Sequence, residues 1–144
     1  MMALVDRALV FNPNFAHGWH VSGALRQWAG QPDIAIDHLE AALRISPRDR
    51  IASPLSVIGG AHFPSRRFDQ AVPKLLLAIQ EDPSYPSAYR WLAACYARLG
   101  RLDEAREIAR RLSAMTPVAV PRAMYWRNPK DRELFLQGLR LAAG

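Results

Sequence analysis

The sequence has little cysteine and no long apolar run, and each of these absences excludes some classes of protein. Cys95 is the single cysteine among 144 residues, so neither an internal disulfide nor a cysteine-based metal cluster can form. No apolar stretch approaches the roughly 20 residues that a membrane helix needs, and the first residues lack the apolar core of a signal peptide. We therefore expect a cytoplasmic protein with no membrane span.

Low-complexity tracts and runs of one charge sign are also missing. Hydrophobic residues make up 50% of the chain, which is enough for one globular core. The net charge of +6 comes almost entirely from arginines spread along the chain, many of them beside acids. This spread favours solvated helix faces over a nucleic-acid footprint. Nucleic acid is therefore the third-ranked of the partner classes we consider.

Prolines at nearly constant spacing divide the chain into repeated units. Pro13, Pro47, Pro83 and Pro117 follow one another at steps of 34, 36 and 34 residues. Before each proline, apolar residues recur three and four positions apart, which is helical spacing. Each unit is thus expected to be a helix, a tight turn and a second antiparallel helix that ends near its proline.

Small residues recur at fixed places in these units. In the first helix they are Gly23, Gly59 and Ala93, and in the second helix Ala35, Ala71 and Ala105. Such residues let the two helices of a unit approach closely. Gly30 and Gly100 stand where the first helix must reverse, a position that favours a left-handed backbone.

These columns resemble the tetratricopeptide repeat, which has an aromatic, a small residue four later, a turn glycine, an alanine and a closing proline. In the first unit they are Trp19, Gly23, Gly30, Ala35 and Pro47. The resemblance implies an all-α, right-handed α-solenoid of about three hairpins with a C-terminal capping helix. The expected segments are a half repeat at 1–13, repeats at 14–47, 48–83 and 84–117, and a linker with the capping helix at 118–144.

The second unit departs most from the pattern. Leu55 stands in the aromatic column and Arg66 in the turn-glycine column. We expect this hairpin to be the least regular, with Ser53 capping a helix that Pro54 opens. In the first unit, Arg26 stands where a tyrosine is common.

The two ends differ from the repeats. Residues 1–13 match only the second half of a unit, so Val5, Leu9 and Val10 should be left partly uncovered, and the simplest interpretation is a C-terminal piece of a longer protein. After an extended linker at 118–127, Asn128 is a good N-cap for the capping helix. The apolar stripe of that helix is Leu134, Phe135, Gly138, Leu139 and Ala142.

The tail also resembles the C-terminal repeat region of alphaproteobacterial class III adenylate/guanylate cyclases. The matching residues are Arg127, Pro129, Asp131, Phe135, Gly138, Leu139 and Arg140. This resemblance implies a bacterial signal-transduction protein whose catalytic domain would lie upstream of Met1. The present chain would then be its regulatory or oligomerising region.

Catalytic and metal-binding constellations are not evident in the sequence. His17 and His20 lack a nearby third ligand, so we expect them to line a groove rather than to bind metal. Cys95 lies among alanines and is typical of a packed apolar residue. The pair Gly59 and Gly60 has no following lysine and is no phosphate loop. We therefore predict no enzyme activity in this chain, no cofactor and no metal.

The remaining candidate site is the inner groove that first helices build. Helical spacing predicts that it presents His17, His20, Ala24, Gln27, Trp28, Ser56, Gly60, Phe63, Arg90, Trp91, Ala94 and Arg98. Related chaperone-binding repeats use asparagines where Ala24 and Gly60 stand, so a chaperone-tail clamp is disfavoured. The predicted function is a protein-interaction module that binds a peptide or partner domain, with some acidic character in the ligand. The alternative is the cyclase-region role, with other domains of its own parent chain as partners.

Overall fold

The computed structural model describes residues 1–117 and 128–144. Within these residues the chain is all helical. The helices are α1 (Met2–Phe11), α2 (Ala16–Trp28), α3 (Pro32–Ile45), α4 (Ala52–His62), α5 (Phe68–Glu81), α6 (Pro86–Arg98), α7 (Leu102–Met115) and α8 (Pro129–Ala143). Residues 118–127, which include the predicted linker, lie outside the described part.

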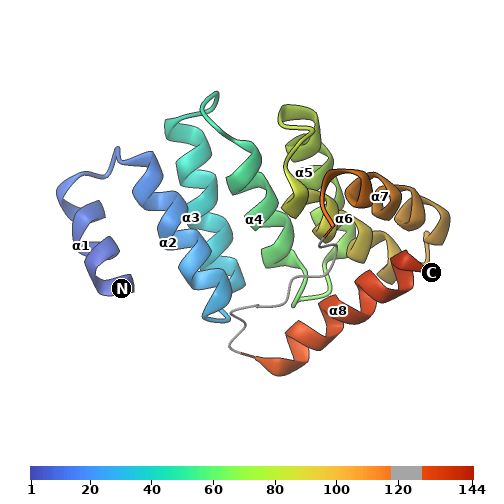
Figure 1. The fold of residues 1–144 in the computed structure, drawn as a ribbon. Coiled ribbons are helices and arrows are strands. Elements are labelled where there is room, and N and C mark those ends of the chain that lie inside the picture. The colour runs from blue at the N-terminus through green and yellow to red at the C-terminus, as the bar shows by residue number, and fades with distance from the viewer. Residues whose placement is uncertain (118–127) are drawn as a thin grey trace.

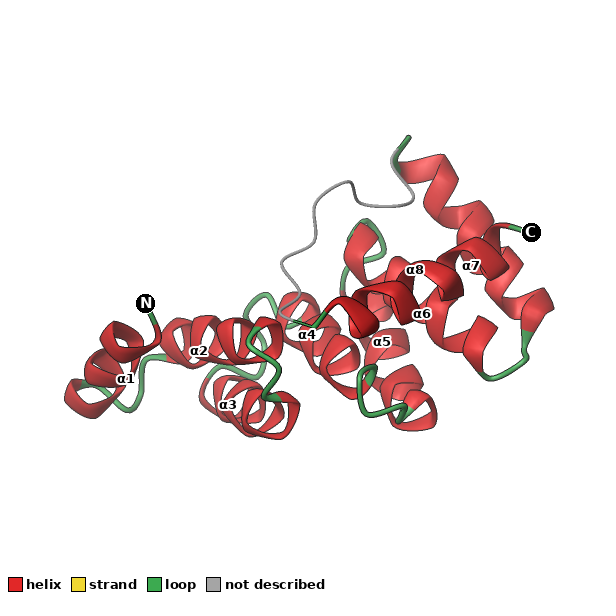
Figure 2. Ribbon diagram, turned by 90° about the horizontal axis from the view of Figure 1, so that it is seen from below, coloured by secondary structure: helices red, strands yellow, loops and turns green. Residues whose placement is uncertain are grey.

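Three antiparallel hairpins follow one another in an α-solenoid (Figure 1). They pair α2 with α3, α4 with α5, and α6 with α7, and each first helix also packs on the preceding hairpin. Helix α1 precedes the hairpins and packs against α2. It corresponds to the second helix of a repeat. The view from below shows α8 lying outside this series, against α6 (Figure 2). The predicted all-α solenoid of tetratricopeptide hairpins is confirmed.

Small residues in the first helices allow the close helix pairing. A Cβ added to Gly59 would lie 2.5 Å from the Leu75 Cγ in α5, and one added to Gly23 would collide with Leu39 in α3. Real Cβ atoms are not found at such separations, so both glycines are required by the packing.

The turns of the three hairpins share one backbone conformation. Gly30 and Gly100 have φ values of 80° and 78°, and Arg66 has 56° at the matching position. The left-handed turn is therefore kept even where the glycine is replaced, at the cost of strain in a residue that has a Cβ.

The aromatic and proline columns are connected by a hydrogen bond. The Trp19 Nε1 donates to the carbonyl oxygen of Pro13 at 2.8 Å, and the Tyr89 hydroxyl donates to that of Pro83 at 2.7 Å. Each aromatic thus fixes the loop before its own helix. Leu55 has no group that could make the bond, which explains in part why the second unit departs from the other two.

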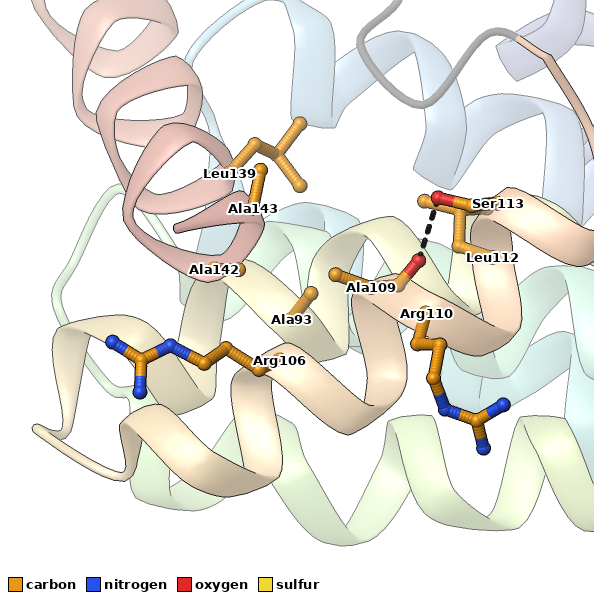
Figure 3. A pocket seen from close by; sticks show the side chains of 9 residues that line it. All are labelled: Ala93, Arg106, Ala109, Arg110, Leu112, Ser113, Leu139, Ala142 and Ala143. Atoms are coloured by element: carbon orange, nitrogen blue, oxygen red, sulfur yellow. Dashed lines mark hydrogen bonds between the residues drawn. The ribbon is translucent and has the colours of Figure 1, made fainter.

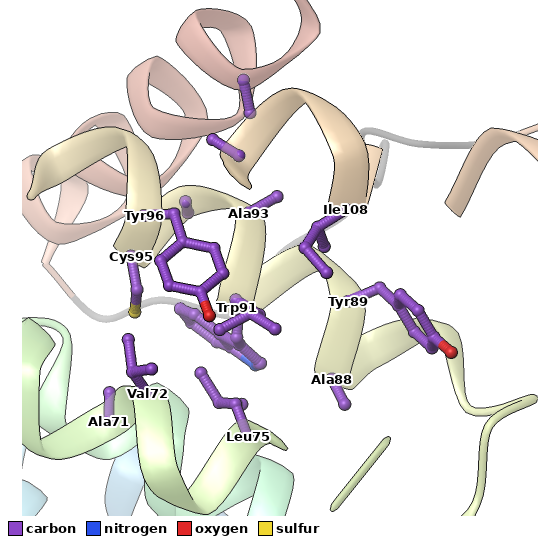
Figure 4. Close-up of a cluster of buried hydrophobic side chains, with 14 of the residues drawn as sticks. Ala71, Val72, Leu75, Ala88, Tyr89, Trp91, Ala93, Cys95, Tyr96 and Ile108 are labelled. Atoms are coloured by element: carbon purple, nitrogen blue, oxygen red, sulfur yellow. The ribbon is translucent and has the colours of Figure 1, made fainter. Parts of the chain in front are cut away.

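A cluster of buried hydrophobic side chains lies in the last two hairpins and α8 (Figure 4). It includes Leu75 from α5, Trp91 and Cys95 from α6, Ile108 from α7 and Phe135 from α8. Helix α8 is therefore an integral part of the core and not an appended tail.

Two local expectations need correction. Helix α4 begins at Ala52 with Ile51 as N-cap, so Ser53 is inside the helix and makes no capping bond. At the N-terminal end, Leu9 is buried against the next hairpin, whereas Val10 and Phe11 are 82% and 89% exposed. By contrast, the Asn128 side chain caps α8 by accepting from the Lys130 backbone N–H at 3.0 Å, as expected.

Candidate partner-binding groove

The inner face is the surface formed by the first helices α2, α4 and α6. The structure places the twelve predicted groove residues on these helices or, for Phe63, directly after α4. His17 is exposed. Those that are half-buried are His20, Ala24, Trp28, Arg90 and Arg98, and those that are buried are Gln27, Ser56, Gly60, Phe63, Trp91 and Ala94.

Helix α8 covers the C-terminal part of α6 and also Phe63, directly after α4, and we call this part the covered half. The Phe135 ring lies 4.3 Å from the Trp91 ring and 5.7 Å from the Phe63 ring, measured between centroids. A Cβ added to Gly138 would lie 3.1 Å from the Ala94 Cβ. Contrary to the expectation of an open groove, Phe63, Trp91 and Ala94 do not face solvent, because α8 packs on them.

One arginine ties α8 to α6 by hydrogen bonds. The Arg98 Nη2 donates to the Leu134 carbonyl oxygen and to the Gln137 Oε1, both at 3.0 Å. Further along, α8 leaves a hollow of about 370 Å³ between itself, α6 and α7. Ala93, Ala142 and Leu139 line that hollow (Figure 3). Helix α8 is thus packed closely along the inner face and only loosely against the outer helix α7.

The N-terminal ends of the first helices remain accessible, and we call this part the open half. The Ser53 Oγ lies 3.1 Å from the His20 Nε2, and the Tyr85 hydroxyl donates to the same Oγ at 3.3 Å. Nearby, the Ser56 Oγ donates to the Ser87 Oγ at 3.4 Å. These bonds connect the first helices of all three hairpins through polar side chains.

A cavity of about 450 Å³ opens beside this network. It is lined by His17 and His20 from α2, by Ser53 from α4, by Ala42, Leu43 and Ser46 at the C-terminal end of α3, and by Asp49 and Arg50 from the loop between α3 and α4. Burial, and secondarily the neighbouring His17, lower the pKa of His20 below its ordinary value. His20 is therefore neutral at pH 7 and can act as either donor or acceptor.

Sequence reasoning missed several residues of the open half. Ser53 was expected at a helix cap, and Asp49, Arg50 and Tyr85 were not singled out. Tyr85 stands four residues before Tyr89, in the column that holds Phe15 in the first unit. A tyrosine hydroxyl in that column is the sequence feature that could have indicated a polar contact by Tyr85.

Catalytic and metal chemistry find no support in the described residues. No group of three histidine, cysteine or acidic side chains is placed there to hold a metal ion. The Ser22 Oγ lies 2.9 Å from the His38 Nδ1, but Ser22 is fully buried and also accepts from Arg26. Burial raises the pKa of the Cys95 thiol, so it remains protonated. In the same part of the chain, no helix is long and apolar enough to cross a membrane.

Comparisons with protein families and with solved structures agree with a fold built from helical hairpins. Residues 65–123 match the family model for the tetratricopeptide repeat. The fold is a tetratricopeptide-repeat solenoid. No curated protein matches the sequence.

Several solved structures with a similar fold match nearly the whole chain. The crystal structure of MamA has a TM-score of 0.73 at 20% identity, covering 99% of this chain and 84% of that one. The first repeat domain of Spaghetti (RPAP3), bound to the HSP90 peptide SRMEEVD, has 0.67 at 21%, covering 90% and 96%. YrrB, described as having an unusual peptide-binding site, has 0.67 at 23%, covering 98% and 74%.

Proposed function

We propose that this protein is an interaction module that binds a peptide or a partner domain in the open half of the inner face. The observation that carries the proposal is the polar network of His20, Ser53 and Tyr85 beside an accessible cavity. These groups can hydrogen-bond a peptide backbone, and Arg50 can pair with an acidic side chain. Spaghetti and YrrB, whose folds are similar, are described with peptides or a peptide-binding site.

Of the twelve residues predicted from the sequence, those of the open half are the proposed contacts for such a ligand. His17 is exposed at the cavity, and His20 is half-buried beside it. Arg90 is half-buried further along the same half, whereas Ser56 is buried and stays outside the proposed contacts. The acidic character of the ligand is proposed from Arg50 and from the net charge of +6.

The experiment is a selection of displayed random peptides on the full chain, followed by affinity measurement with a labelled selected peptide. Ser53→Ala should weaken binding about five-fold, because about 1 kcal/mol is lost with a hydrogen bond. Ser113→Ala, on the exposed face of α7, is the matched control and should leave affinity unchanged. Failure to enrich any peptide, or full affinity in both Ser53→Ala and His20→Ala, would contradict the proposal.

The cyclase alternative stays a prediction. It rests on the tail residues around Phe135 and Gly138, and in this structure both of these pack against α6. Reading the coding sequence upstream of Met1 tests it directly, because the alternative requires a cyclase domain there.

A further inference from the structure

A second cavity, of about 470 Å³, adjoins the one that His20 lines, and we call it the edge cavity. It lies between the loop that joins α3 to α4, the first turn of α4 and the end of α5. Because each hairpin is antiparallel, these parts lie at the same edge of the solenoid, the upper one in Figure 1. Arg50 and Ser53 line both cavities, so a ligand can pass from one to the other.

Oppositely charged side chains line the edge cavity without pairing. Arg48 and Arg50 come from the loop, whereas Glu81 is the last residue of α5. All three are exposed, and none of them forms an ion pair with any residue that the structure describes. Elsewhere on the surface such charges do pair, as Arg110 does with Glu107 at 2.6 Å. The two arginines therefore form a positive subsite that is open to a ligand.

The negative side of the edge cavity consists of Glu81 and Asp82, which we call the negative subsite. The Asp82 Oδ1 accepts from the Ser84 backbone N–H at 3.0 Å and from the Ser84 hydroxyl at 2.7 Å. These bonds hold the pKa of Asp82 below its ordinary value, so the carboxylate is ionised at pH 7. The negative subsite thus keeps its charge under physiological conditions.

The loop that carries the arginines differs from the other loops at this edge. It spans residues 46–51, whereas the corresponding loops span 12–15 and 82–85, so it is two residues longer. Arg50 has φ 50°, a left-handed conformation that is strained for a residue with a Cβ. Such strain persists where the surroundings fix it, and it is frequent at ligand sites. Here it occurs at the residue that both cavities share.

We propose that the edge cavity binds an extended peptide segment that carries both an acidic and a basic side chain. The acidic side chain pairs with the positive subsite and the basic one with the negative subsite. The inference rests on the proposed function and deepens it, because it adds a basic residue to the ligand. An extended segment suits the site because the adjoining cavities at Ser53 let its backbone continue toward His20.

Charge reversal on both partners tests the proposal. Random seven-residue peptides are displayed and selected on the full chain, and a selected peptide with one acidic and one basic residue is labelled. Glu81→Lys should weaken its binding about five-fold, because attraction is replaced by repulsion. Replacing the basic residue of the peptide by glutamate should restore the affinity to within about two-fold.

The opposite subsite has its own reversal. Arg48→Glu should weaken the same peptide about five-fold, and a peptide whose acidic residue is replaced by lysine should recover. Arg48 and Glu81 are exposed, and a lysine at the C-terminal end of α5 is favourable for the helix, so both variants should fold. Circular dichroism checks this.

Asp37→Lys is the matched control for the change in net charge. Asp37 is exposed on α3 and lies outside the edge cavity. The variant should bind the selected peptide with unchanged affinity, because attraction to a distant exposed charge is screened at physiological ionic strength. This result would assign the losses to the two subsites and not to the charge of the whole protein.

Enriched peptides that lack a paired acid and base would overturn the inference, as would the absence of recovery with the reversed peptides. Binding that falls with Ser53→Ala but is indifferent to Glu81→Lys would refute only this inference and would leave the proposed function standing. Failure to enrich any peptide would contradict the proposed function itself, and this inference with it.

Discussion

The ring of Phe135 lies 4.3 Å from the ring of Trp91, tilted by 40°. This contact joins the last helix of the chain to the first helix of the third hairpin. Because of this contact, α8 covers the half of the inner face that contains Trp91. The half that contains His20 stays accessible.

Replacing Phe135 should show how firmly α8 is held. Phe135 is 1% exposed, so Phe135→Ala should lower the free energy of unfolding by about 3 kcal/mol. Leu141→Ala, at a side chain that is 48% exposed on the same helix, should change it by less than about 0.5 kcal/mol. Urea denaturation followed by circular dichroism measures both. Equal values for the two variants would show that α8 contributes little to the fold.

The ion pair of Asp6 and Arg26 should hold α1 on the first hairpin. The Arg26 Nη2 contacts the Asp6 carboxylate at 2.9 Å, and the Arg26 side chain is only 12% exposed. Asp6→Ala should cost about 1 kcal/mol and speed hydrogen exchange in α1. Asp33→Ala removes the carboxylate that pairs with Arg67 but is 79% exposed, and it should have no measurable effect. Unchanged α1 exchange in Asp6→Ala would refute this role.

The positive φ of Arg66 predicts a stabilising substitution. Arg66 has φ 56°, whereas the matching Gly30 has φ 80°. Arg66→Gly should raise the free energy of unfolding by about 0.5–1 kcal/mol, because glycine adopts this conformation without strain. Gly100→Ala, the reverse change at the third turn, should lower it by about 1 kcal/mol. Thermal unfolding of the two variants and wild type checks the signs, and a destabilised Arg66→Gly would disprove the argument.

Stability should fall on mild acidification. Burial is the main cause that lowers the pKa of His20, His38 and His62 below the ordinary value of 6.5. Their folded pKa values lie below the unfolded ones, so the unfolded chain binds more protons and stability rises with pH. This contribution is complete above about pH 6.5 and is lost as the pH falls from there through the folded pKa values.

The free energy of unfolding should therefore be smaller at pH 5 than at pH 7.5, at constant ionic strength. His38→Gln, which can still accept a hydrogen bond from Ser22, should reduce the difference. A protein equally stable at both pH values would rule out these histidine shifts.

Much of the fold can be predicted from the sequence because repeats encode local contacts. The spacing of Pro13, Pro47, Pro83 and Pro117 predicts the hairpins, and Gly23 and Gly59 predict where helices pack closely. Gly30 and Gly100 do adopt the left-handed turn. Each of these features depends on residues within one unit, so periodicity and residue size are sufficient to infer it.

The site is less predictable because it depends on contacts between units. Helical spacing places Phe63, Trp91 and Ala94 on the inner face but cannot tell that α8 returns to cover them. The loop residues Asp49 and Arg50 line the cavity together with His20 of the preceding helix α2, a meeting that the repeat pattern does not show.

The sequence alone determined the helical repeat, its turn positions and the absence of a second cysteine that could form an internal disulfide with Cys95. Only the tertiary structure decided which part of the inner face is accessible, because Phe135 and Gly138 contact α6 residues that lie some 40 positions earlier in the chain. Such long-range packing is set by the joint shape of several hairpins, and no periodic pattern within one unit records it.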